Sequence, residues 1–214
     1  MKSLSEWQAW GEIDPLYAVA TVAGKAKTDD SPWSEGEFFA SGLVAWNVFK
    51  RRWDAYGRPN SSCLEIGCGA GRLTRALASD FQRLDAIDVS PAMLRYATRS
   101  VPCPNVHFQL SSGAKVPLND GAVDAVFSTH VFQHVNTIDE AINMFEEVFR
   151  VLSPTGSMMI HLPVIIWPGG ATKRFHVAVD RLKAALGNIR AAVRRRAFKL
   201  GLQKKPIMRD ASRY

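Results

Sequence analysis

The sequence predicts an α/β fold with a doubly wound, mostly parallel sheet, on two observations. Strand and helix patterns alternate between residues 59 and 163, and the first strand ends in a run with glycine at three alternate positions, Gly67, Gly69 and Gly71. Parallel strands need a crossover between them, usually a helix, so the alternation predicts parallel pairing. Ligands of such sheets bind at the carboxyl ends of the strands, which makes the glycine run the first candidate site.

Residues 1–58 are predicted to form a helical segment ahead of the sheet. Ser34 and Glu37 have the spacing of a capping box, and a helix is expected from there to Gly57. The apolar face predicted for this helix consists of Phe38, Leu43, Val44 and Val48.

The segment 59–163 supplies the strands and the crossover helices. Strands are expected at 63–67, 84–89, 106–111, 123–129 and 157–162, and helices at 72–79, 91–100 and 137–152. Ser90 followed by Pro91 is a favourable helix start, because serine caps free amide groups and proline fits the first turn. Residues 153–156 are expected to form a turn.

Composition limits the class of protein. A chain of 214 residues with 47% hydrophobic and 22% charged residues is typical of one soluble globular domain. No apolar run is long enough to span a bilayer, and the N-terminus lacks the pattern of a secretory signal. The three cysteines (Cys63, Cys68 and Cys103) do not have the spacing of a metal site. No metal is therefore predicted, and a reduced, cytoplasmic chain is expected.

The positive charge is concentrated in residues 164–214, which are predicted to form a basic C-terminal helical segment. Residues 173–209 contain twelve Lys or Arg and one acidic residue, whereas the whole chain has a net charge of +7. Within 173–205, apolar residues recur at spacings of three and four. This helix is expected first to pack on the body or on a second copy in a homodimer. A membrane surface is the second alternative, and nucleic acid is the least favoured partner.

The residues of the glycine run match neither of two common phosphate-binding motifs. A P-loop needs Gly-Lys-Ser/Thr at its end, but Arg72 and Leu73 follow Gly71. The dinucleotide fingerprint G-x-G-x-x-G fails from either Gly67 or Gly69, because Arg72 or Thr74 stands at the last position. What remains is an acidic residue, Glu65, followed by three alternating glycines. An aspartate, Asp88, closes the next strand, where a carboxylate can accept hydrogen bonds from ribose hydroxyls.

Together these motifs resemble the class I S-adenosylmethionine-dependent methyltransferases, which have a Rossmann-like sheet. "LEIGCGAGRLT" is similar to the family's first motif, and "DAIDVSPAML" to its second-strand motif, whose acidic residue is here Asp88. The resemblance continues through "VPLNDGAVDAVFSTHVFQHV" and "EEVFRVLSPTGSMMIHLP", so that it covers about residues 60 to 163. It implies S-adenosyl-L-methionine as cofactor and S-adenosyl-L-homocysteine as product.

The resemblance and the motifs together assign a set of cofactor-binding residues. The predicted set is Glu65, Gly67, Cys68, Gly69, Gly71, Asp88, Val89, Met93, Ser112, Gly113 and Thr129. Glu65 has a second possible role, as a structural acid that bonds loop amides. Met93 is expected either to cover the adenine or to belong to the core.

The chain departs from the family pattern at two places. Ser112 stands where the family often has an acidic residue that accepts from the adenine amino group. After Pro163 no convincing pair of strand patterns follows, so the family's last two strands are predicted to be absent. The fifth strand is then expected to lie at an exposed or unusually covered edge.

Candidate catalytic residues follow the fourth strand. His130 and His134 are placed to take a proton from an acceptor, and each has the alternative of packing or capping the loop. His161, at the end of the fifth strand, is a third candidate on weaker grounds. Four aromatic residues are candidates either for a lid, as in the family, or for a cluster packed on the core: Trp7, Trp10, Tyr17 and Trp33.

The function predicted from the sequence is methyl transfer to an oxygen or nitrogen of a small-molecule acceptor. Two alternatives stay open. One is a methyltransferase for RNA or lipid-linked substrates, reached through the basic segment. The other is a catalytically silent subunit with the methyltransferase fold, which acts as an interaction module.

Overall fold

The computed structural model describes residues 4–135, 137–161 and 184, and its centre is one parallel sheet. The strands are β1 (Ser62–Ile66), β2 (Arg83–Asp88), β3 (Val106–Leu110), β4 (Val123–Ser128) and β5 (Leu152–Ile160). They lie in the order β3-β2-β1-β4-β5, and every neighbouring pair is parallel. The chain therefore starts at the centre of the sheet, winds to one edge, and returns to build the other. This confirms the predicted doubly wound α/β fold.

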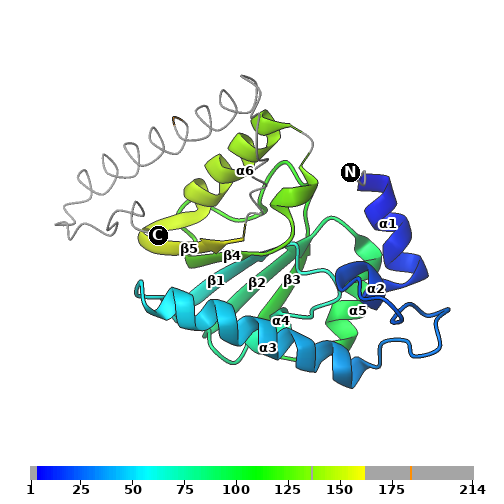
Figure 1. Ribbon diagram of the computed structural model, residues 1–214. Helices are drawn as coiled ribbons and strands as arrows, with labels where there is room; N and C mark the ends of the chain where they lie inside the picture. The colour runs from blue at the N-terminus through cyan, green and yellow to red at the C-terminus, as the bar shows by residue number, and fades with distance from the viewer. Residues whose placement is uncertain (1–3, 136, 162–183, 185–214) are drawn as a thin grey trace, which may run out of the picture.

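Helices cover both faces of the sheet (Figure 1). They are α1 (Leu4–Ile13), α2 (Pro15–Val19), α3 (Glu35–Asp54), α4 (Thr74–Leu77), α5 (Pro91–Ser100) and α6 (Ile138–Val151), with a short 3-10 helix, η1, at Phe132–His134. Helices α3, α4 and α5 lie on one face, and α6 lies on the other. None of the helices in the described part of the chain is long and apolar enough to cross a membrane.

Local capping signals form as the sequence predicts. At the start of α3, the Ser34 hydroxyl accepts from the Glu37 amide and the Glu37 carboxylate accepts from the Ser34 amide. At the start of α5, the Ser90 hydroxyl accepts from the Met93 amide, and Pro91 occupies the first turn. These contacts join residues three positions apart, so they need no tertiary support.

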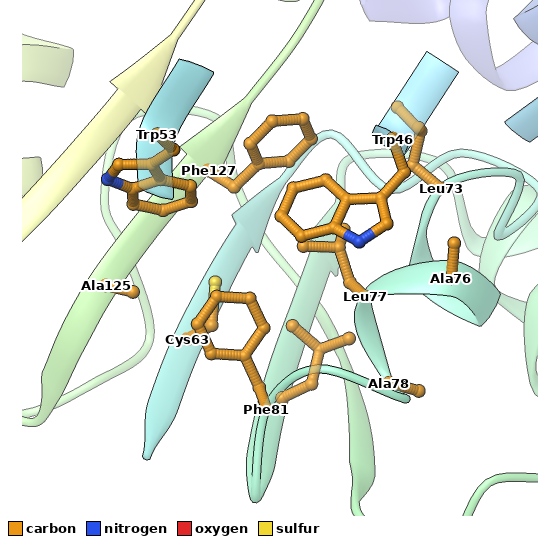
Figure 2. Close-up of a cluster of buried hydrophobic side chains, with 11 residues drawn as sticks. Trp46, Trp53, Cys63, Leu73, Ala76, Leu77, Ala78, Phe81, Ala125 and Phe127 are labelled. Carbon is orange, nitrogen blue, oxygen red and sulfur yellow. The ribbon is translucent and has the colours of Figure 1, made fainter. Parts of the chain in front are cut away.

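The buried face of α3 differs from the predicted one. Of the four predicted residues only Phe38 is buried, whereas the side chains of Leu43 and Val44 are 51% and 68% exposed. Trp46 and Trp53 enter the core instead, where they surround Phe127 on β4 (Figure 2). Two indole rings bury far more apolar area than two aliphatic side chains, so the face that carries them turns inward.

Glycine 42 lets α3 approach the glycine loop closely. A Cβ at this position would lie 2.0 Å from the main-chain oxygen of Arg72, far inside van der Waals contact. The helix therefore rests directly on the main chain that follows Gly71.

A second difference concerns residues 153–156, which are not a separate turn before the last strand. Strand β5 begins at Leu152, opposite Val123, and Ala125 is opposite Ser157, so Asp124 faces a bulge of four residues. The Asp124 carboxylate accepts hydrogen bonds from the hydroxyls of Ser61, Ser62 and Ser153. It thereby ties the bulge to the start of β1.

Several predictions concern residues that the structure does not describe. Apart from Ala184, the basic segment with its apolar pattern over 173–205 lies outside the described residues, and so does the part of the chain for which the family's last two strands were predicted to be absent. Within the described part of the chain, β5 is the edge strand on its side of the sheet.

Candidate functional site

The glycine run forms the loop between β1 and α4, and each of its glycines has a positive φ. The φ values are 75° at Gly67, 53° at Gly69 and 85° at Gly71. The space beside each is also filled: a Cβ would lie 2.1 Å from Val131 at Gly67 and 2.5 Å from Val19 at Gly69. Both backbone conformation and close packing therefore require glycine here.

Asp88, at the end of β2, is held against this loop by main-chain amides. One carboxylate oxygen accepts from the Gly69 amide at 2.8 Å, and the other accepts from the Ser90 amide at 2.9 Å. Burial raises the pKa of Asp88, and the amide hydrogen bonds oppose part of that rise. The Val89 amide also hydrogen-bonds to this carboxylate. A carboxylate has about four lone-pair positions, so these amides leave room for a hydroxyl donor.

Glu65, on β1, is buried beneath the same loop with only 3% of its surface exposed. Its carboxyl group accepts a hydrogen bond from the Thr74 hydroxyl at 2.6 Å. Burial raises the pKa of Glu65 to about 7; the negative charge of Asp88 adds to the rise, whereas the Thr74 bond and Arg72 oppose it. Glu65 therefore ties β1 to the start of α4.

The ends of β2 and β3 bring together the residues predicted for the adenine. The Ser111 amide donates to the Asp88 main-chain oxygen at 2.9 Å, and Val89 lies 3.4 Å from the Cβ position at Gly113. Ser112 is exposed beside them. Met93 is only 3% exposed and packs in a cluster with Phe38, Phe39, Ala70 and Val101. Its burial favours the core alternative.

The two histidines predicted after β4 have different surroundings. His130 has a φ of 60°, uncommon for a residue with a side chain, and its ring centroid lies 5.0 Å from that of His161. Burial lowers the pKa of His130, and the nearby His161 and Arg72 lower it further. His134 instead makes an edge contact with Trp7 at 4.7 Å between ring centroids. The structure thus pairs His130 with His161 and joins His134 to α1.

Thr129 and Cys68 complete the predicted set. The Thr129 hydroxyl oxygen is buried and has no hydrogen-bond partner among the described residues. Cys68 lies within the glycine loop, and burial raises the pKa of its thiol well above the ordinary value. A buried, protonated thiol is a poor nucleophile, so Cys68 contributes main chain and packing rather than covalent chemistry.

The N-terminal segment lies across the start of α5 (Figure 1). Trp10 packs on the cluster that contains Met93, and a Cβ at Gly11 would lie 2.6 Å from the Ser90 hydroxyl oxygen. Trp33 is anchored separately, by an indole hydrogen bond to the Ala20 oxygen at 2.9 Å. Trp10 and Trp33 thus pack on the core, as one of the two alternatives predicts, and Trp10 lies 6.3 Å from Tyr17 between ring centroids. Trp7 instead contacts His134 in the loop after β4.

Four positions beside this site were not predicted from the sequence. Val19 and Val131 pack on the glycines, Gly42 seats α3 against the loop, and Arg72 has a buried guanidinium nitrogen without a partner among the described residues. Only Arg72, directly after the last glycine, had a sequence signal that pointed to it.

Comparisons with known proteins agree with this geometry. The family described as "Methyltransferase domain" matches residues 64–160, which include the glycine loop and all strands after the first residues of β1. Residues 64–160 therefore match a methyltransferase domain, in agreement with the resemblance to the class I S-adenosylmethionine-dependent methyltransferases.

Individual methyltransferases are similar to this chain. A malonyl-[acyl-carrier protein] O-methyltransferase of Serratia marcescens is 32% identical over 47% of this chain and 38% of its own length. A 2-methyl-6-phytyl-1,4-hydroquinone methyltransferase of Synechocystis is 30% identical over 48% of this chain and 32% of its own length. The chain thus matches about a third of the length of these two relatives.

A solved structure shows the same fold. Phosphoethanolamine N-methyltransferase 1 of Haemonchus contortus, in complex with phosphoethanolamine and S-adenosylhomocysteine, has a TM-score of 0.56 at 16% identity. The match covers 73% of this chain and 30% of that chain.

The methyltransferase family identifies the cofactor as S-adenosylmethionine, and the residues present fit it. Asp88 retains acceptor capacity for a ribose hydroxyl, and it lies at the carboxyl end of β2 beside a loop that the three positive-φ glycines allow to turn tightly. Glu65 lies close enough to Asp88 for their charges to interact, so both carboxyl groups belong to one polar site.

The raised pKa of Glu65 predicts a pH-dependent stability of this methyltransferase fold. In the unfolded chain Glu65 ionises near its ordinary pKa of 4.5, whereas the folded chain keeps the proton up to about 7. Between these values the folded state binds more protons, so stability falls as pH rises and the loss is complete above about 7. The free energy of unfolding of Glu65→Gln, relative to that of the wild type, is therefore expected to rise by about 2 to 3 kcal/mol from about pH 5 to about pH 8.

Urea unfolding of both proteins at the two pH values measures this difference. Glu37→Gln is the control, since the lowered pKa of Glu37 leaves its carboxylate ionised in the folded and the unfolded chain across this range, so the difference from wild type is expected to stay constant. A constant difference between Glu65→Gln and wild type across that range would contradict the prediction.

Proposed function

We propose that the protein transfers a methyl group from S-adenosylmethionine to an oxygen or nitrogen of a small-molecule acceptor. The observation that carries the proposal is the Asp88 carboxylate, held by the Gly69 and Ser90 amides beside a loop of three positive-φ glycines. A nucleoside needs a carboxylate that accepts from its ribose hydroxyls at the carboxyl end of a strand, which is where Asp88 lies.

The cofactor, when bound, supplies an electrophilic methyl carbon on a sulfonium. In the transfer, the acceptor's lone pair forms a bond to that carbon while the carbon–sulfur bond breaks, and the sulfur keeps the electron pair as a thioether. The protein's part is to hold the reacting atoms in line and to exclude water. An acceptor that carries a proton on the reacting atom must also lose it.

His130 is the residue that we assign to proton removal. Its lowered pKa keeps the imidazole neutral near neutral pH, the form that accepts a proton. His134 has its ring against Trp7, which supports the packing alternative for that residue.

The relatives support a small or carrier-bound acceptor. Two of them are described as acting on malonyl-[acyl-carrier protein] and on a hydroquinone, and both names specify a small reacting group. We extend only this class to the present chain.

Calorimetric titration with S-adenosylhomocysteine, followed by an acceptor screen, tests the proposal. We expect micromolar binding, and release of S-adenosylhomocysteine from S-adenosylmethionine with at least one carboxylate, phenol or amine in the screen. No binding by folded protein would overturn the cofactor assignment. Binding without turnover on any acceptor would favour the silent-subunit alternative.

A further inference from the structure

Polar groups gather on the side of the glycine loop that is opposite to Asp88. We call Arg72, Thr129, His130 and His161 the Arg72 cluster. Arg72 follows the loop after β1, Thr129 and His130 follow β4, and His161 follows β5. These three strands are neighbours, and the His161 amide donates to the Ser128 oxygen at 2.9 Å, so the β4 and β5 ends lie together. Asp88 lies on the β2 side of the same loop.

Three atoms of the cluster are buried without a hydrogen-bond partner among the described residues. They are Nε of Arg72, Oγ1 of Thr129 and Nδ1 of His161. A buried polar atom left unpaired costs free energy, so a single such atom calls for an explanation. Three of them beside one loop indicate a site built for a polar ligand.

The chemistry of the cluster selects the kind of ligand. Arg72 brings a guanidinium cation, Thr129 a hydroxyl donor and the two histidines ring N–H groups, and none of the four is an acid. The Arg72 charge is near enough to His130 to lower the pKa of its imidazole. Glu65 is the acid whose charge acts on the pKa of Arg72, and its carboxyl group is already bonded to Thr74.

Helix α3 contacts the cluster at two positions. The Phe49 ring, on α3, lies 5.9 Å from the His161 ring between centroids, and Gly42 of the same helix packs on Arg72. Burial lowers the pKa of Arg72, and a guanidinium that has lost hydration attracts an anion more strongly.

We infer that the Arg72 cluster binds an oxyanion, a carboxylate or a phosphate, carried by the methyl acceptor. The inference rests on the proposed function, because it places the acceptor on one side of the glycine loop and the ribose-binding Asp88 on the other. Arg72 and Thr129 act in it as acceptor-binding residues, and His161 orients both the anion and His130.

Histidine-ring NMR of the full chain, saturated with S-adenosylhomocysteine, tests the inference. The probes are sodium malonate and sodium phosphate, titrated at constant ionic strength against sodium chloride. We expect saturable shifts of the His130 and His161 signals, while the signal of exposed His107 on β3 stays unchanged. The probe that binds more tightly identifies the anion as carboxylate or phosphate.

Substitutions connect the shifts to Arg72. Arg72→Gln is expected to weaken probe binding about tenfold or more, because a charge-assisted contact is lost. Arg75→Gln is the matched control, because it removes an exposed arginine that stacks on Phe39. It is expected to leave the affinity for the probe anion unchanged. His161→Gln provides a second variant in case Arg72→Gln does not fold, and it is expected to weaken binding in the same direction.

Three results would overturn the inference. The first is a response to malonate and phosphate that equals the response to chloride. The second is saturable binding that neither Arg72→Gln nor His161→Gln weakens. The third is a loss of S-adenosylhomocysteine affinity in Arg72→Gln without any probe binding in the wild type, which would assign Arg72 to the cofactor. Failure of the wild type to bind S-adenosylhomocysteine at all would instead overturn the proposed function itself.

Discussion

Asp88→Ala is expected to weaken S-adenosylhomocysteine binding about 100-fold or more, since the proposed charge-assisted hydrogen bonding to the ribose is lost. The substitution also frees the Gly69 and Ser90 amides that Asp88 holds at 2.8 and 2.9 Å. The substitution therefore removes both the link between the loop and the end of β2 and the carboxylate proposed to accept hydrogen bonds from the ribose. Calorimetric titration of the folded variant measures the affinity.

Two further variants separate the binding role of Asp88 from a general loss of structure. Asp88→Asn keeps one oxygen acceptor, so it is expected to fold and to bind more weakly than wild type. Asp120→Ala removes an exposed carboxylate that pairs with Arg150 at 3.1 Å, and it is expected to bind normally. Wild-type affinity in a folded Asp88→Ala protein would show that the ribose is held elsewhere.

Gly42→Ala is expected to destabilise the protein by about 2 kcal/mol or more, although alanine favours helix over glycine by about 1 kcal/mol. The added methyl group would lie 2.0 Å from the Arg72 oxygen and 2.8 Å from its carbonyl carbon. Neither atom belongs to a flexible side chain, so α3 must move away from the loop. Thermal or urea unfolding measures the loss.

Gly36→Ala is the matched control, on the same helix. A Cβ at Gly36 would meet no atom within 4 Å, so the substitution is expected to be neutral or to stabilise by up to about 1 kcal/mol. Equal effects of the two substitutions would contradict the close contact between α3 and Arg72. A smaller loss in Gly42→Ala than in Gly36→Ala would contradict it more strongly.

Local interactions explain why much of the architecture was predictable. The capping box of Ser34 and Glu37 and the cap at Ser90 involve residues three positions apart, so the sequence alone determines them. The alternation of strands and helices determines parallel pairing, because a crossover has to return the chain to the same end of the sheet. The glycine triplet and Asp88 lie at strand ends, where the strand order brings them together.

The sequence by itself thus determined the fold class, the caps and the meeting of the glycine loop with Asp88, whereas tertiary packing decided the rest. The face of α3 depends on how much area Trp46 and Trp53 bury against Phe127, a residue more than 70 positions away. The pairing of His130 with His161 and the unpaired atoms around Arg72 depend on β4 and β5 ending side by side. A hydrophobic pattern ranks residues by their own polarity, but only the folded sheet decides which distant side chains fill the same space.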